Sequence, residues 1–215
     1  MSKVAKIGFM VMVLSVLGLF SARAAVKPVV QFRPIALMQS DGIYDIMVDH
    51  YTTESRWWGS YTYWDEGETS DTDVGYLPNI AAGARIDLGD KLYTELTGVG
   101  GLLTSEYIDS SMFGFDAALR FKFGKNGKFA VGPHVGLVRL SPEWSGSAKV
   151  EFSSTTGSIA GLGFAIDFGD MLGLLLQVDY LSAKSDVTTS GGWRSNIKEI
   201  DFSGPMLQLG LNFKF

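Results

Sequence analysis

The 215-residue sequence contains no cysteine, and this absence excludes several kinds of site at once. Disulfides, thiol catalysis, thiolate metal sites and acylation of a mature N-terminal cysteine all require a cysteine side chain. Histidine is almost as scarce, because only His50 and His134 are present. After residue 20, no segment approaches the roughly 20 consecutive apolar residues that a membrane-spanning helix requires. If the mature protein crosses a membrane, it must do so with β-strands.

The N-terminus has the pattern of a cleavable secretory signal. Two lysines precede an apolar run over residues 7–20 and a small-x-small site, Ala22-Arg23-Ala24. This pattern predicts export, with a signal peptide over residues 1–24 and a single mature domain over residues 25–215. The mature chain keeps 15 basic residues (18 minus 3) against 23 acidic ones, a net charge near −8. Such an acidic chain is not expected to bind nucleic acid.

The last nine residues alternate apolar and polar side chains without a break. Period-two alternation puts Leu207, Leu209, Leu211, Phe213 and Phe215 on one face of a strand and polar residues on the other. A closed membrane barrel needs such a last strand, apolar outside and able to pair with the first. The segment resembles the C-terminal strand of bacterial outer-membrane β-barrel proteins. That resemblance implies that Phe213 and Phe215 form the signal for the barrel-assembly machinery.

Similar alternation recurs upstream in segments that suit a tilted transmembrane strand of about 9–11 residues. The seven predicted strands cover residues 76–88, 92–104, 112–123, 128–140, 158–168, 171–183 and 200–215. Tight, glycine-containing connections are expected at 89–91, 124–127 and 169–170, and longer polar ones at 65–75, 141–157 and 185–199, with a short one at 108–111. The stretch Val99-Gly100-Gly101 is expected to mark a bulge or a weak stretch. Short turns on the periplasmic rim and long loops outside are typical of outer-membrane barrels.

The segment over residues 26–64 decides the number of strands. Residues 29–38, 43–51 and 57–64 each have a strand-like pattern, and Ser40-Asp41-Gly42 has the composition of a turn. One membrane strand here gives an antiparallel up-and-down barrel of eight strands, with the remainder forming a β-rich extension above or beside the membrane. Three strands give ten. We favour eight, because the mature chain of about 190 residues must also supply long loops.

Charged residues fall on the strand face opposite the apolar one, as they must when the apolar face meets lipid. An eight-stranded barrel has an interior that side chains nearly fill, so we expect a polar plug rather than a wide pore. The expected lumen network consists of Arg85, Glu95, Asp116, Arg120, Gln177 and Asp179, with Lys122 as a further inward-facing residue. Because buried charges need partners, Arg120 is expected to pair with Asp116 or Glu95. A structural role is favoured over a narrow path for ions or solutes.

Aromatic residues gather where strands are expected to meet the membrane surface. The expected interfacial girdle comprises Trp57, Trp58, Tyr61, Tyr63, Trp64, Tyr76, Tyr93, Tyr107 and Tyr180. The segment 57–64 has an alternative interpretation as a platform on which a carbohydrate would stack. The acidic stretch 65–73 is interpreted as a solvated loop, although its oxygens suit a divalent cation, because the spacing matches no EF-hand.

We expect no catalytic residue, cofactor or metal site. His134 has no neighbouring serine in the sequence and is expected to point into the barrel, while His50 lies near Asp45, Asp49 and Ser55 and keeps a minor catalytic interpretation. A lipid-modifying enzyme is therefore the weakest of the membrane hypotheses.

The mature chain as a whole resembles the small Gram-negative outer-membrane barrels related to OmpA, OmpX, OmpW and the opacity-type surface proteins. The resemblance rests on the signal peptide, the alternating strands, the short turns and the terminal phenylalanine, and it implies location in the outer membrane. Its implied partners are outer-membrane lipid and lipopolysaccharide, the assembly machinery, and an external ligand or host surface. We expect a non-enzymatic structural or surface-interaction role through external loops. A narrow channel is the alternative, and a soluble periplasmic β-sandwich is the least favoured fold.

Overall fold

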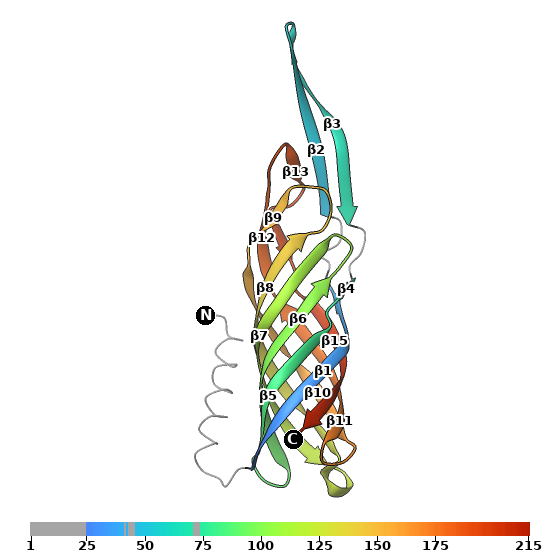
Figure 1. The fold of residues 1–215 in the computed structure, drawn as a ribbon, viewed down its shortest axis with the longest axis vertical. Coiled ribbons are helices and arrows are strands. Elements are labelled where there is room, and N and C mark those ends of the chain that lie inside the picture. The colour runs from blue at the N-terminus through green and yellow to red at the C-terminus, as the bar shows by residue number, and fades with distance from the viewer. Residues whose placement is uncertain (1–24, 41, 43–45, 71–73) are drawn as a thin grey trace.

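The computed structural model describes residues 25–40, 42, 46–70 and 74–215, and the expected signal peptide lies outside these residues. The chain is almost entirely β-structure (Figure 1). The elements are β1 (Ala25–Gln39), β2 (Ile46–Arg56), β3 (Gly59–Ser70), β4 (Val74–Tyr76), β5 (Asn79–Asp87), β6 (Leu92–Thr104), β7 (Ile108–Phe123), the 3-10 helix η1 (Lys125–Gly127), β8 (Phe129–Trp144), β9 (Val150–Phe152), β10 (Thr155–Asp167), β11 (Leu172–Ser182), β12 (Lys184–Thr189), β13 (Trp193–Ser195), β14 (Glu199–Asp201) and β15 (Gly204–Lys214). Within the described residues, no helix has the length and apolarity needed to span a membrane.

An antiparallel sheet closes on itself to form the barrel. Its strands follow the order β1, β5, β6, β7, β8, β10, β11 and β15, and β15 then pairs with β1 from Val29↔Lys214 to Met38↔Met206. Strand β4 pairs with the same neighbours as β5, so the two are one barrel strand interrupted at Leu77-Pro78. The prediction of eight strands is confirmed. The alternative of ten is wrong, because β2 pairs with β3 and β13, and β3 with β2, rather than with barrel strands.

The predicted tight turns are confirmed at the end of the barrel that also holds residue 25 and Phe215 (Figure 1). Gly89, Gly124 and Gly169 have φ angles of 127°, 75° and 129°, a region that side chains with a Cβ rarely adopt. The bulge expected near Gly100 is absent, because β6 and β7 keep an unbroken register. The irregularity lies in β1 instead, between Phe32 and Ile35, where Pro34 has no N–H to give to the ladder.

At the opposite end, the connections contain more strand than the sequence predicted. Part of the acidic stretch expected to be a loop, residues 65–70, belongs to β3, while residues 71–73 lie outside the described residues. The expected loops at 141–157 and 185–199 contain β9, β12 and β13, and residues 108–111 belong to β7. Strands β14, β12 and β9 form one small sheet, and β13, β2 and β3 form another. Together they build a β-structured extension above the barrel.

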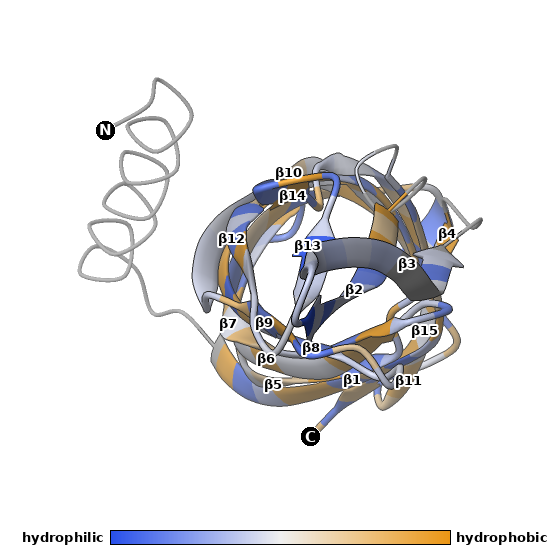
Figure 2. Cartoon of the chain, turned by 90° about the horizontal axis from the view of Figure 1, so that it is seen from above, coloured by the Kyte–Doolittle hydropathy of each residue, from blue (hydrophilic) through white to orange (hydrophobic). Residues whose placement is uncertain are grey.

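The outer wall is apolar along the lower barrel. Phe115, Leu137, Leu162 and Val178 are each more than half exposed and point away from the lumen, as do Phe213 on β15 and Phe215 just after it. In water such a surface would be costly, whereas hydrocarbon solvates it. Looking down the ring of strands, Figure 2 shows apolar and polar residues alternating along them. The exterior therefore suits a bilayer, with the interior left for polar groups.

The lumen has two layers. Toward the loops, a buried apolar cluster includes Met38, Leu77, Leu103, Leu140 and Phe202. Below it, the inner wall carries buried polar side chains that originate from almost every strand. The apolar layer continues into the extension through Ile46, Val48 and Trp193, so that barrel and extension share one core.

Candidate functional site

The center of the polar layer is His134 on β8, held between two carboxylates. Its Nδ1 lies 3.0 Å from Asp116 Oδ1 on β7, and its Nε2 bonds Asp179 Oδ1 on β11. The Gln177 amide also lies 3.1 Å from Nε2. A neutral imidazole has one N–H, so only the imidazolium donates to both carboxylates. This arrangement ties three strands together across the lumen.

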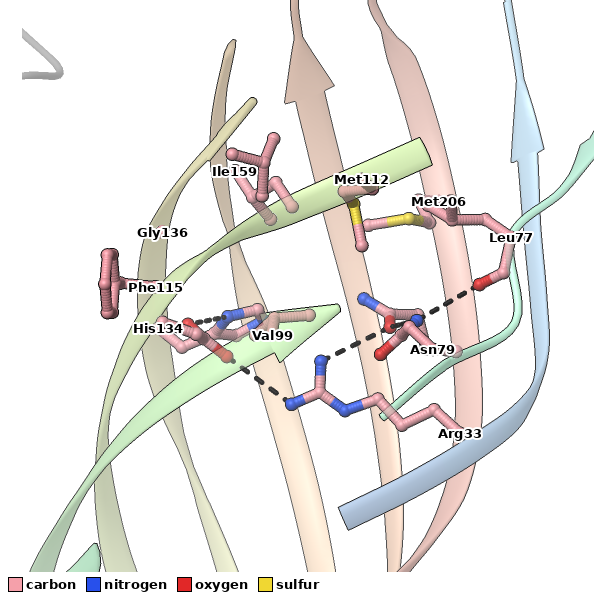
Figure 3. Close-up of a pocket in the computed structure, with 13 residues that line it drawn as sticks. Arg33, Leu77, Asn79, Val99, Met112, Phe115, His134, Gly136, Ile159 and Met206 are labelled. Carbon is pink, nitrogen blue, oxygen red and sulfur yellow. Dashed lines mark hydrogen bonds and ion pairs between the residues drawn. The ribbon is translucent and has the colours of Figure 1, made fainter. Parts of the chain in front are cut away.

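Arg33 and Gln208 extend this network to the two strands where the barrel closes. Arg33 on β1 lies 3.5 Å from Asp116 Oδ2 and also bonds Gln31, while Gln208 on β15 donates to Asp179 Oδ2 at 2.6 Å. Asn79 donates to Gln208 Oε1 at 2.9 Å (Figure 3). The closing seam is therefore joined inside the barrel by side chains as well as by the backbone ladder.

Glu95 on β6 continues the network toward the turns. It accepts hydrogen bonds from Gln31 Nε2 at 3.2 Å and from Asn212 Nδ2 at 3.3 Å. The polar layer contains three cationic side chains, Arg33, Arg120 and His134, and three carboxylates, Glu95, Asp116 and Asp179. Its formal charges therefore cancel.

The expected ion pair of Arg120 with Asp116 or Glu95 is not formed. Arg120 is 1% exposed and donates instead to the backbone carbonyl oxygens of Gly132 (2.5 Å) and Gly163 (3.2 Å). Gly163 makes this possible, because a Cβ there would lie only 2.3 Å from the guanidinium. Gly161 leaves room for Asp179 in the same way. Strand β10 therefore contributes glycines that leave room for the Arg120 and Asp179 side chains, and no polar side chain of its own, to the polar layer.

A second cluster lines the mouth of the barrel at the tight turns. Arg85 lies over the Tyr93 ring at 3.6 Å and pairs with Asp87 (3.3 Å) and Asp167 (3.4 Å). Lys122 and Lys214 each approach one of these carboxylates at 2.8 Å. Tyr93 was expected in the interfacial girdle, but it is 1% exposed and faces the lumen, where its ring stacks with Arg85. An open vestibule of about 760 Å³ lies at this mouth.

The structure places all six residues of the expected network on the inner wall, but it divides them. Asp116, Gln177 and Asp179 join around His134, Glu95 binds neighbouring amides, and Arg85 belongs to the mouth. Sequence reasoning did not include Arg33, Gln31 and Gln208. The signal was present for all three, because Gln208 alternates with apolar residues in the terminal strand, and Gln31 and Arg33 alternate with Val30 and Phe32 before the irregularity at Pro34.

The polar layer and the apolar layer above it close the lumen. The cavity between them, lined by Arg33, Asn79, His134, Met112 and Met206 among others, has a volume of about 10 Å³ (Figure 3). That space is about one water molecule in size. Of the two histidines, His134 bonds carboxylates and a glutamine, and the His50 ring packs 4.9 Å from Trp193 in the extension. Among the described residues, no group of His, Asp or Glu side chains is placed to hold a metal ion.

Outside the barrel, the β2–β3 hairpin is the element that projects farthest (Figure 1). Its lower half is held from both sides. On one side β2 pairs with β13, and on the other Glu68 of β3 accepts hydrogen bonds from the Trp144 indole (2.6 Å), from both donors of Ser147 and from Ala148 N. Gly146 permits this approach, because a Cβ there would lie 2.2 Å from Glu68 Oε2. The hairpin is therefore mounted on the extension.

The upper half of the hairpin has two different faces. Cross-strand pairing puts Glu54, Arg56, Tyr61 and Tyr63 on one face, which together with Trp58 we call the aromatic face. Thr53, Ser55, Ser60 and Thr62 lie on the other, the hydroxyl face, where Thr53 pairs with Thr62 at 2.7 Å and Ser55 with Ser60 at 2.8 Å. Trp57 and Trp58 form the turn between the strands. The girdle prediction is wrong for Trp57, Trp58, Tyr61 and Tyr63, which lie in the projecting hairpin.

Because Glu68 attaches the hairpin to the extension, the stability of the hairpin is expected to depend on pH. Burial by itself raises the pKa of Glu68, but the hydrogen bonds from Ser147, Trp144 and Ala148 outweigh it and hold the pKa below its ordinary value. A lowered pKa means that the contribution is complete above about pH 4.5 and is lost as the pH falls through the folded-state value. We expect Glu68→Gln to lower amide protection factors over residues 46–70 about fivefold at pH 7, roughly 1 kcal/mol.

Hydrogen exchange measured by mass spectrometry checks this. The matched control is Glu199→Ala, which removes an exposed carboxylate that pairs with Lys184 in another loop. It should leave the hairpin unchanged. Equal protection in wild type and Glu68→Gln at pH 7 would show that the Glu68 contacts do not hold the hairpin.

Comparison with known proteins supports the fold. No family model matches the sequence, and no curated protein matches it. Among solved structures, OprG from Pseudomonas aeruginosa is 13% identical, with 88% of this chain and 96% of that chain covered and a TM-score of 0.51. AlkL in DMPC bilayers (12% identity, 91% and 92% covered, TM-score 0.49) and the Neisserial surface protein NspA (18% identity, 89% and 99% covered, TM-score 0.40) are also similar. The chain thus shares the closed barrel fold of the outer-membrane protein OprG, and its apolar exterior suits a bilayer.

Proposed function

We propose that this protein is a non-enzymatic surface-interaction protein, in which the barrel is a closed anchor and the β2–β3 hairpin is the recognition element. The observation that carries the proposal is the hairpin itself. Its turn exposes Trp57 by 93% and Trp58 by 62%, and the hairpin rises above the other described elements (Figure 1). Large exposed aromatic groups on a soluble surface mark interaction sites.

The composition of the turn supports this proposal. Two-residue hairpin turns favor Asn, Asp and Gly, because these residues adopt the backbone conformations required there. Here the two positions are tryptophans, and the glycine follows at Gly59 with a φ of 145°. A sequence that departs from the local rule without a packing gain is expected at functional positions.

The lumen supports the anchor role. With a cavity of about 10 Å³ between its polar and apolar layers, the part of the lumen above the vestibule is filled as a protein core is filled. A narrow channel remains the alternative function, since the vestibule of about 760 Å³ gives ions access to the periplasmic half of the lumen.

Deleting the upper hairpin tests the proposal. Residues 53–62 would be replaced by Asn-Gly, and both forms would be expressed in a Gram-negative strain that lacks other adhesins. We expect adherence to epithelial monolayers and cell–cell aggregation to fall at least fivefold, while heat-modifiable gel mobility shows that the barrel still folds. Adherence that is independent of the hairpin would overturn the proposal.

Planar-bilayer recordings decide the alternative. We expect the purified wild-type protein to give no discrete conductance steps. Reproducible single-channel steps would favor the channel over the closed anchor.

A further inference from the structure

We propose that the aromatic face of the hairpin is a binding site for a neutral carbohydrate chain on a facing surface. This inference rests on the proposed function and names the chemistry of the partner.

The aromatic face carries two tyrosine rings at alternate positions of β3. The Tyr61 and Tyr63 rings are stacked side by side, with centroids 5.8 Å apart and planes inclined by 29°. Tyr61 is 43% exposed and Tyr63 is 40% exposed, so part of each ring remains open to solvent. The Arg56 guanidinium lies 5.7 Å from the Tyr61 centroid and 5.4 Å from that of Trp58, which joins the turn to the tyrosines. The result is a continuous ridge of rings.

Hydrogen-bonding groups are interleaved with these rings. Glu54 accepts from the Tyr61 hydroxyl at 2.6 Å, from the Tyr63 hydroxyl at 3.3 Å and from Arg56 at 3.1 Å. These contacts hold the rings and the carboxylate in one arrangement. The Tyr61 hydroxyl, followed by Arg56, keeps the pKa of Glu54 below its ordinary value, so that Glu54 is an acceptor at neutral pH. A preorganised set of this kind loses little entropy on binding.

A sugar ring is the ligand that needs both kinds of group. One side of a pyranose presents C–H groups, which the negative face of an aromatic ring attracts, and its rim presents hydroxyls that bind carboxylate and guanidinium groups. A lipid bilayer fits less well, because inserting the hairpin would bury Glu54, Arg56 and the whole hydroxyl face. The two-faced pattern therefore favors a ligand that covers one side of the hairpin and leaves the other in water.

The net charge of the hairpin favours neutral carbohydrates over anionic ones. Strands β2 and β3 contain five acidic residues, Asp49, Glu54, Asp65, Glu66 and Glu68, against one arginine. An anionic glycan or phosphorylated saccharide would be repelled by this hairpin. A neutral chain would not.

The experiment measures sugar binding by the full mature chain in nanodiscs of zwitterionic lipid, since maltoside detergents would compete. The probes are cellohexaose and chitohexaose as neutral chains, an oligogalacturonide as an acidic one, and protein-free liposomes for the membrane alternative. Isothermal titration gives the affinities. We expect at least one neutral hexasaccharide to bind, with Tyr61→Ala and Trp58→Ala each weakening it tenfold or more.

The hydroxyl face supplies the matched control. Thr53→Ala/Thr62→Ala changes the same hairpin at the same height, and we expect its affinity to stay within twofold of wild type. The inference would be overturned if neither neutral probe binds, or if the protein prefers the acidic probe or liposomes. It would also be overturned if the Thr53/Thr62 variant loses as much affinity as Tyr61→Ala and Trp58→Ala. If hairpin deletion abolishes adherence but neutral sugars neither bind nor compete, the proposed function stands and the carbohydrate site falls. If deletion leaves adherence intact, the proposed function itself falls.

Discussion

Replacing His134 by alanine is expected to lower the free energy of unfolding of the barrel by about 3–5 kcal/mol, the cost of leaving buried charges without their partner. The variant leaves Asp116 and Asp179 facing each other across a site where the His134 side chain is 1% exposed. Arg33 at 3.5 Å and Gln208 at 2.6 Å each still contact one carboxylate, and a long hydrogen bond of 3.4 Å from Arg33 to Gln208 then links the two. Urea unfolding in lipid vesicles, followed by tryptophan fluorescence, measures the loss.

Two further variants separate this cause from simple truncation. Asp179→Asn in the His134→Ala background removes one of the opposed charges, and we expect it to recover part of the loss, which a double-mutant cycle quantifies. His50→Ala is the matched histidine control, because His50 lies in the extension and packs on Trp193. It should change the barrel's unfolding free energy by less than about 0.5 kcal/mol. If His134→Ala costs no more than His50→Ala, the Asp116–His134–Asp179 arrangement contributes nothing to stability.

Strand count, turns and topology follow from local pattern, and the sequence predicted them well. Each lipid-facing strand must show apolar residues at period two, and each tight turn must contain residues that adopt positive φ. Both patterns can be recognised from a few consecutive residues. Strand β6 was predicted with its observed bounds for this reason. Strand β1 differs, since its register against β15 shifts at Pro34, so that the inward-facing residues have odd numbers up to Arg33 and even numbers from Ala36 onward.

Pairings inside the lumen could not be predicted in the same way. The inward direction of Arg120 follows from alternation along β7, but its partners are carbonyl oxygens of Gly132 and Gly163, exposed only because neighbouring strands have glycine there. Likewise, the tryptophans at 57 and 58 have the composition of an interfacial girdle, and only the pairing of β2 with β3 and β13 shows that they lie above the membrane. Both outcomes depend on three-dimensional register, which one sequence does not contain.

Introducing arginine at Leu162 is expected to destabilise the barrel by about 2–4 kcal/mol, the cost of a lipid-facing arginine near the bilayer midplane. Leu162 is 61% exposed on β10. Its cross-strand partners Pro133 and Val178 lie on the same outer face of the barrel. It lies about midway along the part of β10 that descends to the turn at Gly169. An exposed position in water would tolerate the charge, so the size of the loss measures how deeply this surface lies in hydrocarbon.

Trp57→Arg is the control, because it introduces the same charge at an exposed position outside the apolar belt. Trp57 is more exposed than Leu162, at 93%, yet it lies at the tip of the hairpin, where an arginine meets water. We expect its effect on the unfolding free energy to stay within about 0.5 kcal/mol. Equal effects of the two substitutions would contradict the membrane position derived from the apolar belt. A large effect at Leu162 with none at Trp57 separates two kinds of exposed apolar side chain: those that a bilayer covers, and those left for a partner to cover.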